Sequence, residues 1–255
     1  MEFAVLGSGS KGNCSVIRCN NTLIMVDCGF SLKEVEARMN QLAISGNEID
    51  ALLVTHEHSD HIAGVAKLAA RYDLAVYMTH GTSQYFNGRK QSIPSNTTLI
   101  HFDEAFTIGE LRITPVLVPH DAKEPCQFIV ESNQQRLGLL SDIGHISENV
   151  ANAYQHCDAL YIEFNHCKTM LAEGPYPAML KRRVGGDWGH LSNCQAQGFV
   201  KSLEGGPLQH LIVGHVSEKN NHQTVVDEAL QVFQSLKSIV VSEQHRIQPW
   251  LQLTK

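Results

Sequence analysis

The sequence predicts an α/β protein in which β-sheets lie between layers of helices. Short apolar segments, expected to be strands, follow one another in hairpins early in the chain and alternate with helical patterns later. A doubly wound Rossmann sheet would alternate strands and helices throughout. Because 255 residues with 43% hydrophobic content are enough for a sizeable core, we expect residues 1–255 to form one domain.

Local signals predict the individual elements. Asn20-Asn21 separates two apolar runs, which indicates a hairpin. Ser31 and Glu34 have the spacing of a capping box, which predicts that a helix begins there. Strands are expected at residues 1–6, 16–18, 23–26, 51–55, 75–78, 111–118, 127–131, 137–140, 159–164 and 211–213. Further helices are expected at residues 61–71, 147–155, 192–202 and 222–236.

Composition narrows the classes of function. The net charge of −6 gives no global basic field to attract nucleic acid, although it leaves room for a nuclease with a local phosphate site. The seven cysteines are odd in number and include no C-x-x-C pair, so we expect reduced thiols in a cytoplasmic protein without a signal peptide. No apolar stretch approaches the roughly 20 residues of a membrane span, so we expect no membrane contact.

The segment Gly7-Ser8-Gly9-Ser10-Lys11-Gly12 fits the G-x-G-x-x-G pattern of dinucleotide-binding loops. That pattern should open a helix, whereas residues 13–17 have the pattern of a strand. We therefore interpret the segment as a structural glycine-rich turn near the site. Its backbone N–H groups are still able to face a phosphate.

The most informative segment is His56-Glu57-His58-Ser59-Asp60-His61, which directly follows the strand expected at 51–55. Side chains two apart on an extended segment point the same way, so His56 and His58 can bind one metal ion together. Asp60 and His61 lie beyond the turn and can reach a second ion. Two ions roughly 3.5–4 Å apart are a known arrangement for hydrolysis.

Three more candidate ligands follow apolar strands. They are His120, Asp142 and His215. A single histidine after a strand is more often a core or surface residue, but the repeated order of strand and then ligand favours a shared site. A carboxylate such as Asp142 can bridge two divalent ions, and imidazoles fill the remaining positions.

These residues carry a resemblance to the metallo-β-lactamase superfamily. Its H-x-H-x-D-H signature matches residues 56–61, and its later motifs match His120, Asp142 and His215. The resemblance implies a four-layer αβ/βα sandwich that holds two divalent metal ions, Zn²⁺ or Mn²⁺, with Fe also suitable. It also implies that Asp27 supports the metal loop.

Residues 120–122, 163–166, 186–193 and 215–221 look like the YycJ (WalJ) group within that superfamily. The group is described as phosphodiesterase-like, with 5′-to-3′ exonuclease activity on DNA, so the resemblance implies a nucleic-acid partner. The chain departs from the group at Cys126, where Gly is usual, and at Cys167, where Asp is frequent. Neither position is a metal ligand.

Phosphodiester hydrolysis at neutral pH needs a strong nucleophile and charge neutralisation. We expect a hydroxide that bridges the two ions to attack phosphorus, with Asp60 coordinating one ion and orienting the hydroxide. The leaving oxygen needs a proton donor, and His190 fits by residue type because histidine titrates near neutral pH. The alternative is that His190 caps or packs beside a helix that begins at Ser192.

Other polar residues are candidates for contacts to phosphate or to the ligands. The tentative set is Glu163, Asn165, His166, Ser192, Asn193, Lys219, Asn220 and Asn221. A buried Glu163–His166 pair and a polar loop at 219–221 are equally good accounts. The basic run Lys181-Arg182-Arg183 is interpreted as an exposed helix end, with a nucleic-acid contact as the alternative.

The pattern therefore favours a dinuclear-metal phosphodiesterase, and three rivals remain. The same ions would serve a small-molecule hydrolase that cleaves a thioester, lactone, lactam or cyclic phosphodiester. Di-iron redox members of the family place Glu where His58 stands and need a flavin domain that the chain lacks. A non-catalytic scaffold is disfavoured by the full ligand set. The sequence specifies no oligomeric state.

Overall fold

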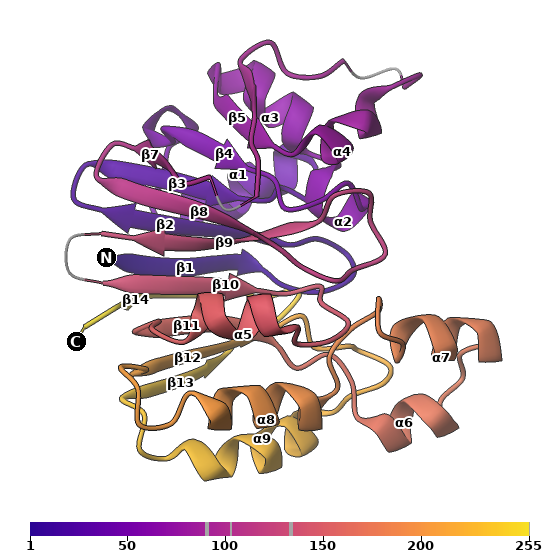
Figure 1. Ribbon diagram of the computed structural model, residues 1–255. Helices are drawn as coiled ribbons and strands as arrows, with labels where there is room; N and C mark the ends of the chain where they lie inside the picture. Colours follow the sequence, from indigo (N-terminus) through magenta and orange to yellow (C-terminus); the bar gives the residue numbers. More distant parts are fainter. Residues whose placement is uncertain (90–91, 103, 133–134, 255) are drawn as a thin grey trace.

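The computed structural model describes residues 1–89, 92–102, 104–132 and 135–254. Within these residues, two seven-stranded sheets lie face to face, and helices cover their outer faces (Figure 1). The predicted four-layer αβ/βα sandwich is confirmed. The helices α6 (Lys168–Glu173) and α7 (Ala178–Val184) project beyond one end of the second sheet (Figure 1).

The first sheet has the strand order β14-β1-β2-β3-β4-β5-β6. Strands β14, β1, β2 and β3 pair antiparallel, and β3 to β6 pair parallel. Its strands are β1 (Glu2–Gly7), β2 (Cys14–Cys19), β3 (Thr22–Val26), β4 (Ala51–Leu53), β5 (Ala75–Met78), β6 (Thr97–Leu99) and β14 (Gln248–Gln252).

The second sheet repeats this plan in the order β13-β12-β11-β10-β9-β8-β7. Strands β7 to β10 pair antiparallel, and β10 to β13 pair parallel. Its strands are β7 (Phe106–Ile108), β8 (Leu111–Leu117), β9 (Cys126–Glu131), β10 (Arg136–Leu140), β11 (Ala159–Glu163), β12 (His210–Gly214) and β13 (Ser238–Val241).

The helices occupy the connections between strands. They are α1 (Leu32–Gln41), α2 (Ser59–Ile62), α3 (Val65–Tyr72), α4 (His80–Ser83), α5 (Glu148–Tyr154), α6 (Lys168–Glu173), α7 (Ala178–Val184), α8 (Asn193–Ser202) and α9 (Gln223–Leu230). Short 3-10 turns span Gly46–Glu48, Gln84–Phe86 and Gln231–Phe233.

The buried side chains form three hydrophobic layers, as expected for four layers of backbone. Successive residues of a strand point to opposite faces. In β3, Met25 packs with the helices outside the first sheet, whereas Ile24 packs between the two sheets. In β11, Leu160 packs under α5, α8 and α9, whereas Tyr161 faces the layer between the sheets. Both of these strands are therefore apolar on both faces.

Three helix predictions need correction. The helix expected at 61–71 is broken into α2 and α3 at Gly64, whose N–H donates to the Cys28 carbonyl at 2.8 Å. A side chain at Gly64 would lie 2.1 Å from the Phe30 carbonyl, so the turn must be glycine. The helix expected at 222–236 is shorter: it consists of α9, followed directly by a 3-10 turn.

The capping box expected at Ser31 and Glu34 forms only one of its two hydrogen bonds. The Ser31 side chain accepts from the Glu34 N–H, but the Glu34 carboxylate binds Arg38 Nε at 2.7 Å instead of the Ser31 backbone.

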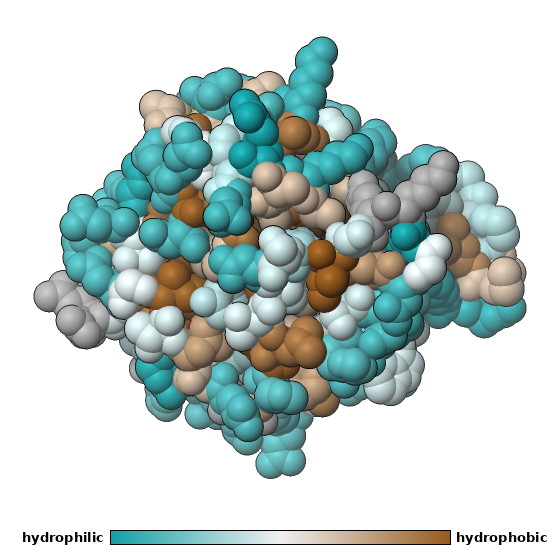
Figure 2. All heavy atoms as spheres, turned by 90° about the horizontal axis from the view of Figure 1, so that it is seen from above, coloured by the Kyte–Doolittle hydropathy of each residue, from teal (hydrophilic) through white to brown (hydrophobic). Residues whose placement is uncertain are grey.

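The surface is largely polar on the face shown in Figure 2, where apolar side chains lie singly or in small groups. Among the described residues, the large apolar side chains exposed most are Met179 at 77% and Trp188 at 62%. They belong to α7 and to the loop that follows it. Among the helices of the described residues, none is both long enough and apolar enough to span a membrane.

Gly29, which follows the first sheet, packs closely against the metal loop: a Cβ at this position would lie 1.8 Å from the Asp60 carbonyl oxygen. We expect Gly29→Ala to lower the free energy of unfolding by about 1–3 kcal/mol, as overpacking does. Chemical denaturation measures it. The matched control is Gly198→Ala on the exposed face of α8, where a Cβ meets nothing within 4 Å. This control should be stabilising by roughly 0.5–1 kcal/mol. Equal stabilities would contradict the packing argument.

Candidate active site

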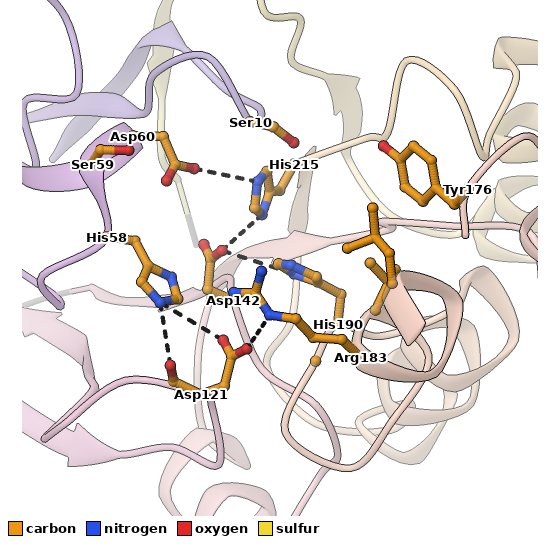
Figure 3. A pocket seen from close by; sticks show the side chains of 13 residues that line it. Ser10, His58, Ser59, Asp60, Asp121, Asp142, Tyr176, Arg183, His190 and His215 are labelled. Carbon is orange, nitrogen blue, oxygen red and sulfur yellow. Dashed lines mark hydrogen bonds and ion pairs between the residues drawn. The ribbon is translucent and has the colours of Figure 1, made fainter. Parts of the chain in front are cut away.

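The predicted ligands converge at the carboxyl ends of strands from both sheets. His56 follows β4, His120 follows β8, Asp142 follows β10 and His215 follows β12. His61 lies in the short helix α2 that opens from the metal loop. These five side chains are buried, whereas those of His58 and Asp60 are 28% and 20% exposed. The seven residues therefore form one cluster with an open side. Figure 3 shows His58, Asp60, Asp142 and His215 at this open side.

Three groups of donor atoms, each within 4.8 Å of one another, are able to hold a cation. They are His56, His58 and His120; His56, His61 and Asp142; and Asp142, His190 and His215. Six of the seven predicted metal ligands take part. Asp60 lies outside these groups, yet its Oδ2 is 3.5 Å from His61 Nε2 and 3.9 Å from His215 Nε2.

Hydrogen bonds fix which nitrogen each imidazole of the first group presents. Thr55 Oγ1 donates to Asp27, so it accepts from His56 Nδ1 at 3.0 Å. His120 Nδ1 donates to the Gly189 carbonyl at 3.0 Å, and His58 Nε2 to the Asp121 carbonyl at 3.2 Å. Carbonyl oxygens only accept, so these nitrogens carry the protons. The nitrogens left as ligand donors are His56 Nε2, His58 Nδ1 and His120 Nε2.

Asp142 connects this group to the second one. Its Oδ2 lies 3.3 Å from His61 Nε2, and its Oδ1 lies 3.1 Å from His215 Nδ1. The same Oδ1 is 4.0 Å from His120 Nε2. One carboxylate thus faces donors of both groups, which is the geometry of a bridging ligand.

The donor set fits divalent cations. His56 Nε2, Asp142 Oδ2 and both ring nitrogens of His215 are buried and have no hydrogen-bond partner in the described part of the chain. Buried polar atoms without partners are costly, and a coordinated cation would satisfy them. Imidazole and carboxylate donors suit Zn²⁺, Mn²⁺ and Fe.

The charges of the site lead to the same conclusion. Burial alone would lower the pKa of His215, but the adjacent Asp142 carboxylate raises it to about 10. Burial likewise opposes a charge on His61, yet Asp142, Asp27 and Asp60 raise its pKa well above the usual value. The carboxylates therefore stabilise positive charge at these rings. A proton on the ring supplies this charge when no metal ion is bound, and a coordinated cation would replace that proton.

Asp27 supports the metal loop from behind, as the resemblance implies. Its Oδ1 accepts from the Thr55 N–H at 2.8 Å, and its Oδ2 accepts from Thr55 Oγ1 at 2.8 Å and from His61 Nδ1 at 2.7 Å. The glycine-rich turn supports the other side: Asn13 Nδ2 donates to Asp60 Oδ2 at 3.1 Å. Strand β2 follows this turn directly, so the turn is structural, as predicted.

Backbone strain is concentrated at the same place. Asp27, Asp142 and His215 have positive φ angles of 61°, 53° and 48°. Such angles are uncommon for residues other than glycine and persist only where the surroundings enforce them. Here each one lies one or two residues after the end of a strand and turns its side chain toward the cluster.

The cluster opens into a cavity of about 340 Å³. Its lining includes His58, Asp60, Asp142 and His215 on one side and Tyr176, Leu180, Arg183 and Val184 on the other. Figure 3 shows Arg183 and His190 reaching into this space opposite Asp60. A substrate held there would contact the ligand cluster directly.

His190 lines the cavity and is bound to a buried carboxylate. Its Nδ1 donates to Glu163 Oε2 at 2.9 Å, which leaves Nε2 for a substrate. Burial opposes ionisation of Glu163, but the His190 ring beside it lowers the pKa of this carboxyl to about 2. Glu163 Oε1 also accepts from the Ile143 and Leu191 N–H groups at 2.9 and 3.0 Å. This carboxylate thus orients His190 and the Asp142 turn together.

None of the eight residues predicted as tentative substrate contacts is among those that line the cavity. Most are buried in a network that joins loops. Asn165 Nδ2 donates to the His215 carbonyl at 3.0 Å, and Asn221 Nδ2 donates to the Phe164 carbonyl at 2.8 Å. The amides of Asn193 and Asn221 bind each other at 2.9 and 3.0 Å. These side chains hold the turns that carry the ligands.

Of the remaining members of that set, Ser192, His166 and Asn220 are buried and Lys219 is exposed. Ser192 begins α8 with a full capping box to Gln195, and His166 bridges to Ser192 as a one-residue parallel pair. Asn220 is buried and accepts the Cys167 N–H with its carbonyl. Lys219 is exposed and lies 5.9 Å from the centre of the Tyr176 ring. Direct contact of these residues with a substrate stays a prediction.

Two residues of the site were not among the predicted site residues, although the sequence analysis gave a nucleic-acid contact as the alternative interpretation of the basic run that contains Arg183. Arg183 enters the cavity from the last turn of α7, and Asp121 binds both Arg183 and the His58 side of the cluster. The sequence offered a weak signal for each: Asp121 directly follows a ligand, and Arg183 closes a basic run. Neither signal could distinguish these positions from ordinary surface charges.

The family model of the β-lactamase superfamily domain matches residues 22–215, so the chain belongs to this superfamily. The matched segment runs from β3 to His215 and contains all seven predicted ligands. The chain is therefore a metal-dependent hydrolase of the metallo-β-lactamase class, as the sequence analysis predicted.

Two relatives are similar over most of their length. Exodeoxyribonuclease YycJ from Bacillus anthracis is 34% identical over 222 residues, which cover 87% of this chain and 84% of that protein. Exodeoxyribonuclease WalJ from Streptococcus pneumoniae is 32% identical over 239 residues, which cover 90% and 88%. The metallo-β-lactamase fold protein YhfI from Bacillus subtilis has the same fold, with a TM-score of 0.72, 16% identity and coverage of 96% and 98%.

Asp27 provides a test of how the site is organised. We expect Asp27→Asn to weaken metal binding about 10–100-fold, because the loss of a carboxylate that orients a ligating imidazole typically has this effect. Competition with a chromophoric chelator measures the affinity. The matched control is Asp227→Asn, an exposed position on α9 whose carboxylate accepts a hydrogen bond from Gln223. This variant should bind metal with the affinity of the unaltered protein. Unchanged affinity in Asp27→Asn would contradict this role.

Proposed function

We propose that this chain is a dinuclear-metal phosphodiesterase that acts as a 5′-to-3′ exonuclease on DNA. The observation that carries the proposal is its similarity to two exodeoxyribonucleases across 84% and 88% of their lengths. The similarity is therefore not confined to the metal loop, which hydrolases of many substrates share. The geometry of the cavity supports the same function.

The chain would hold two divalent ions with distinct ligand sets. His56, His58 and His120 would hold the first, and Asp60, His61 and His215 the second, with Asp142 between them. When bound, the ions would supply a nucleophile at neutral pH and stabilise the charge that develops on the phosphate oxygens. Zinc and manganese are the metals that we propose.

The protein side chains would complete the reaction. Asp60, only 20% exposed, presents its Oδ2 to both His61 and His215 and so would orient the attacking group from the floor of the cavity. His190 would hold a proton at Nε2 and pass it to the leaving oxygen. Glu163 accepts from His190 Nδ1 at 2.9 Å and so keeps Nε2 directed toward the cavity. Proton donation of this kind contributes about 10²–10⁴-fold.

The ligand set can be tested by activity on a panel of substrates. With Zn²⁺ or Mn²⁺, we expect the protein to shorten 5′-phosphorylated DNA, and His58→Ala combined with Asp142→Ala to abolish this activity and the bound metal. The panel includes single- and double-stranded DNA, RNA and a set of thioesters and lactones. Dominant turnover of the thioesters or lactones would reject the phosphodiesterase and favour a small-molecule hydrolase. Unchanged turnover in the double variant would reject the ligand assignment.

The role of His190 can be separated from metal binding by the choice of leaving group. We expect His190→Gln to lower kcat on DNA about 10²–10⁴-fold. The loss should nearly vanish with bis(p-nitrophenyl) phosphate, because p-nitrophenolate leaves without a proton. If both substrates lose activity equally and bound metal falls, His190 is a ligand and not a proton donor.

A further inference from the structure

Arg183 is placed at the cavity by the end of α7. It contributes the one lysine or arginine side chain among the described residues that line the cavity, alongside Asp60, Asp121 and Asp142. Its side chain is 58% exposed, so it is accessible from solvent. Figure 3 shows the guanidinium between Asp121 and the Asp142–His190 side of the cluster. A fixed positive charge thus faces the place where a substrate must lie.

Asp121 orients this guanidinium through one edge. Arg183 Nε donates to Asp121 Oδ2, whereas its two Nη groups make no hydrogen bond within the described part of the chain. Asp121 is itself anchored, since its carbonyl accepts from His58 Nε2 at 3.2 Å and its Oδ1 lies 3.7 Å from the same nitrogen. The guanidinium is therefore fixed through Nε, and within the described residues its Nη groups are free to donate hydrogen bonds to a substrate.

The turn after α7 makes this position rigid. The N–H of His190 donates to the Val184 carbonyl at 2.9 Å, and that of Gly185 donates to the Lys181 carbonyl at 3.0 Å. A Cβ at Gly189 would lie 2.1 Å from the Arg183 carbonyl, so the two segments touch. The carbonyl of Gly189 is also the acceptor for His120 Nδ1. Arg183, His190 and a ligand are thereby joined through one short loop.

We propose that Arg183 is the phosphate clamp of this site, whose Nη groups bind the non-bridging oxygens of the scissile phosphate. This inference rests on the proposed function. The planar guanidinium matches two phosphate oxygens at once, which the point charge of a lysine does not. An anionic phosphodiester gains these two charge-assisted hydrogen bonds, whereas a neutral thioester or lactone does not. Arg183 thus selects the substrate class, and Asp121 is its positioning residue.

The test compares Arg183→Gln and Arg183→Lys with Arg182→Gln, an exposed neighbour on the same turn that does not line the cavity. Calorimetry with the metal-loaded protein measures the binding of thymidine 5′-monophosphate, and steady-state kinetics use 5′-phosphorylated DNA. We expect Arg183→Gln to weaken binding and kcat/KM about 10–100-fold, and Arg183→Lys to restore only part of the loss. Arg182→Gln should stay within about twofold of the unaltered protein, and metal content should be equal in all variants.

Asp121→Asn provides the second measurement. We expect it to weaken thymidine 5′-monophosphate binding less than Arg183→Gln does, and to add nothing when combined with Arg183→Gln, because it acts through the arginine. Equal affinities for Arg183→Gln and Arg182→Gln, or full rescue by lysine, would overturn the clamp. Failure of the unaltered protein to cleave any phosphodiester would instead reject the proposed function, and the mononucleotide measurement would still decide the role of Arg183.

Discussion

The cluster of buried carboxylates and imidazoles between the two sheets is the constraint on which the rest of the structure depends. Asp142, His61 and His215 are almost inaccessible to solvent, and isolated charges in such surroundings are strongly unfavourable. Their burial is tolerable only when each group has a partner of opposite charge. Within the described residues the partners are other members of the cluster, supplemented by Asp27 and Glu163. Cations would complete this balance, which explains why several donor atoms face one another without hydrogen bonds.

The supporting structure is distributed over loops that are far apart in sequence. Asp27 from the first sheet fixes His61, whereas the Gly189 carbonyl from the second half of the chain fixes His120. The carboxylate of Glu163 binds backbone N–H groups beside Asp142 and beside His190. A disturbance in one loop is therefore transmitted to ligands on another. The buried asparagines contribute in the same way, because they connect the turns after β11 and β12 rather than facing the cavity.

The sequence predicted the parts of this structure that have strong local signals. The ligands follow apolar strands, so the segments around His56, Asp142 and His215 were recognisable, as was the glycine-rich turn. The basic run at 181–183 was interpreted as an exposed helix end, and it forms the last turn of α7. The start of this helix was not predicted, because none of its residues is buried, and the half-buried strand β14, which contains Pro249, was missed. The break at Gly64 was missed because it depends on close contact with Phe30, which is distant in sequence. Asp121 and Arg183 depend on a pairing across 62 residues that no local pattern encodes.

The residues around the cavity fall into two groups, the metal ligands and the side chains that only line the cavity. The metal ligands are provided by strand ends and by the loop and helix α2 that follow β4, and the same donors would serve attack on a carbonyl or on a phosphate. Substrate choice must therefore reside in the lining that is not made of ligands. Tyr176, Leu180, Arg183 and Val184 all come from the segment that contains α7 and the turn before it. This segment packs little into the core, so its side chains can change without loss of the fold. Arg183, the one lysine or arginine among the described residues that line the cavity, is bound to Asp121 beside the ligand His120, which couples recognition of the substrate to the metal site.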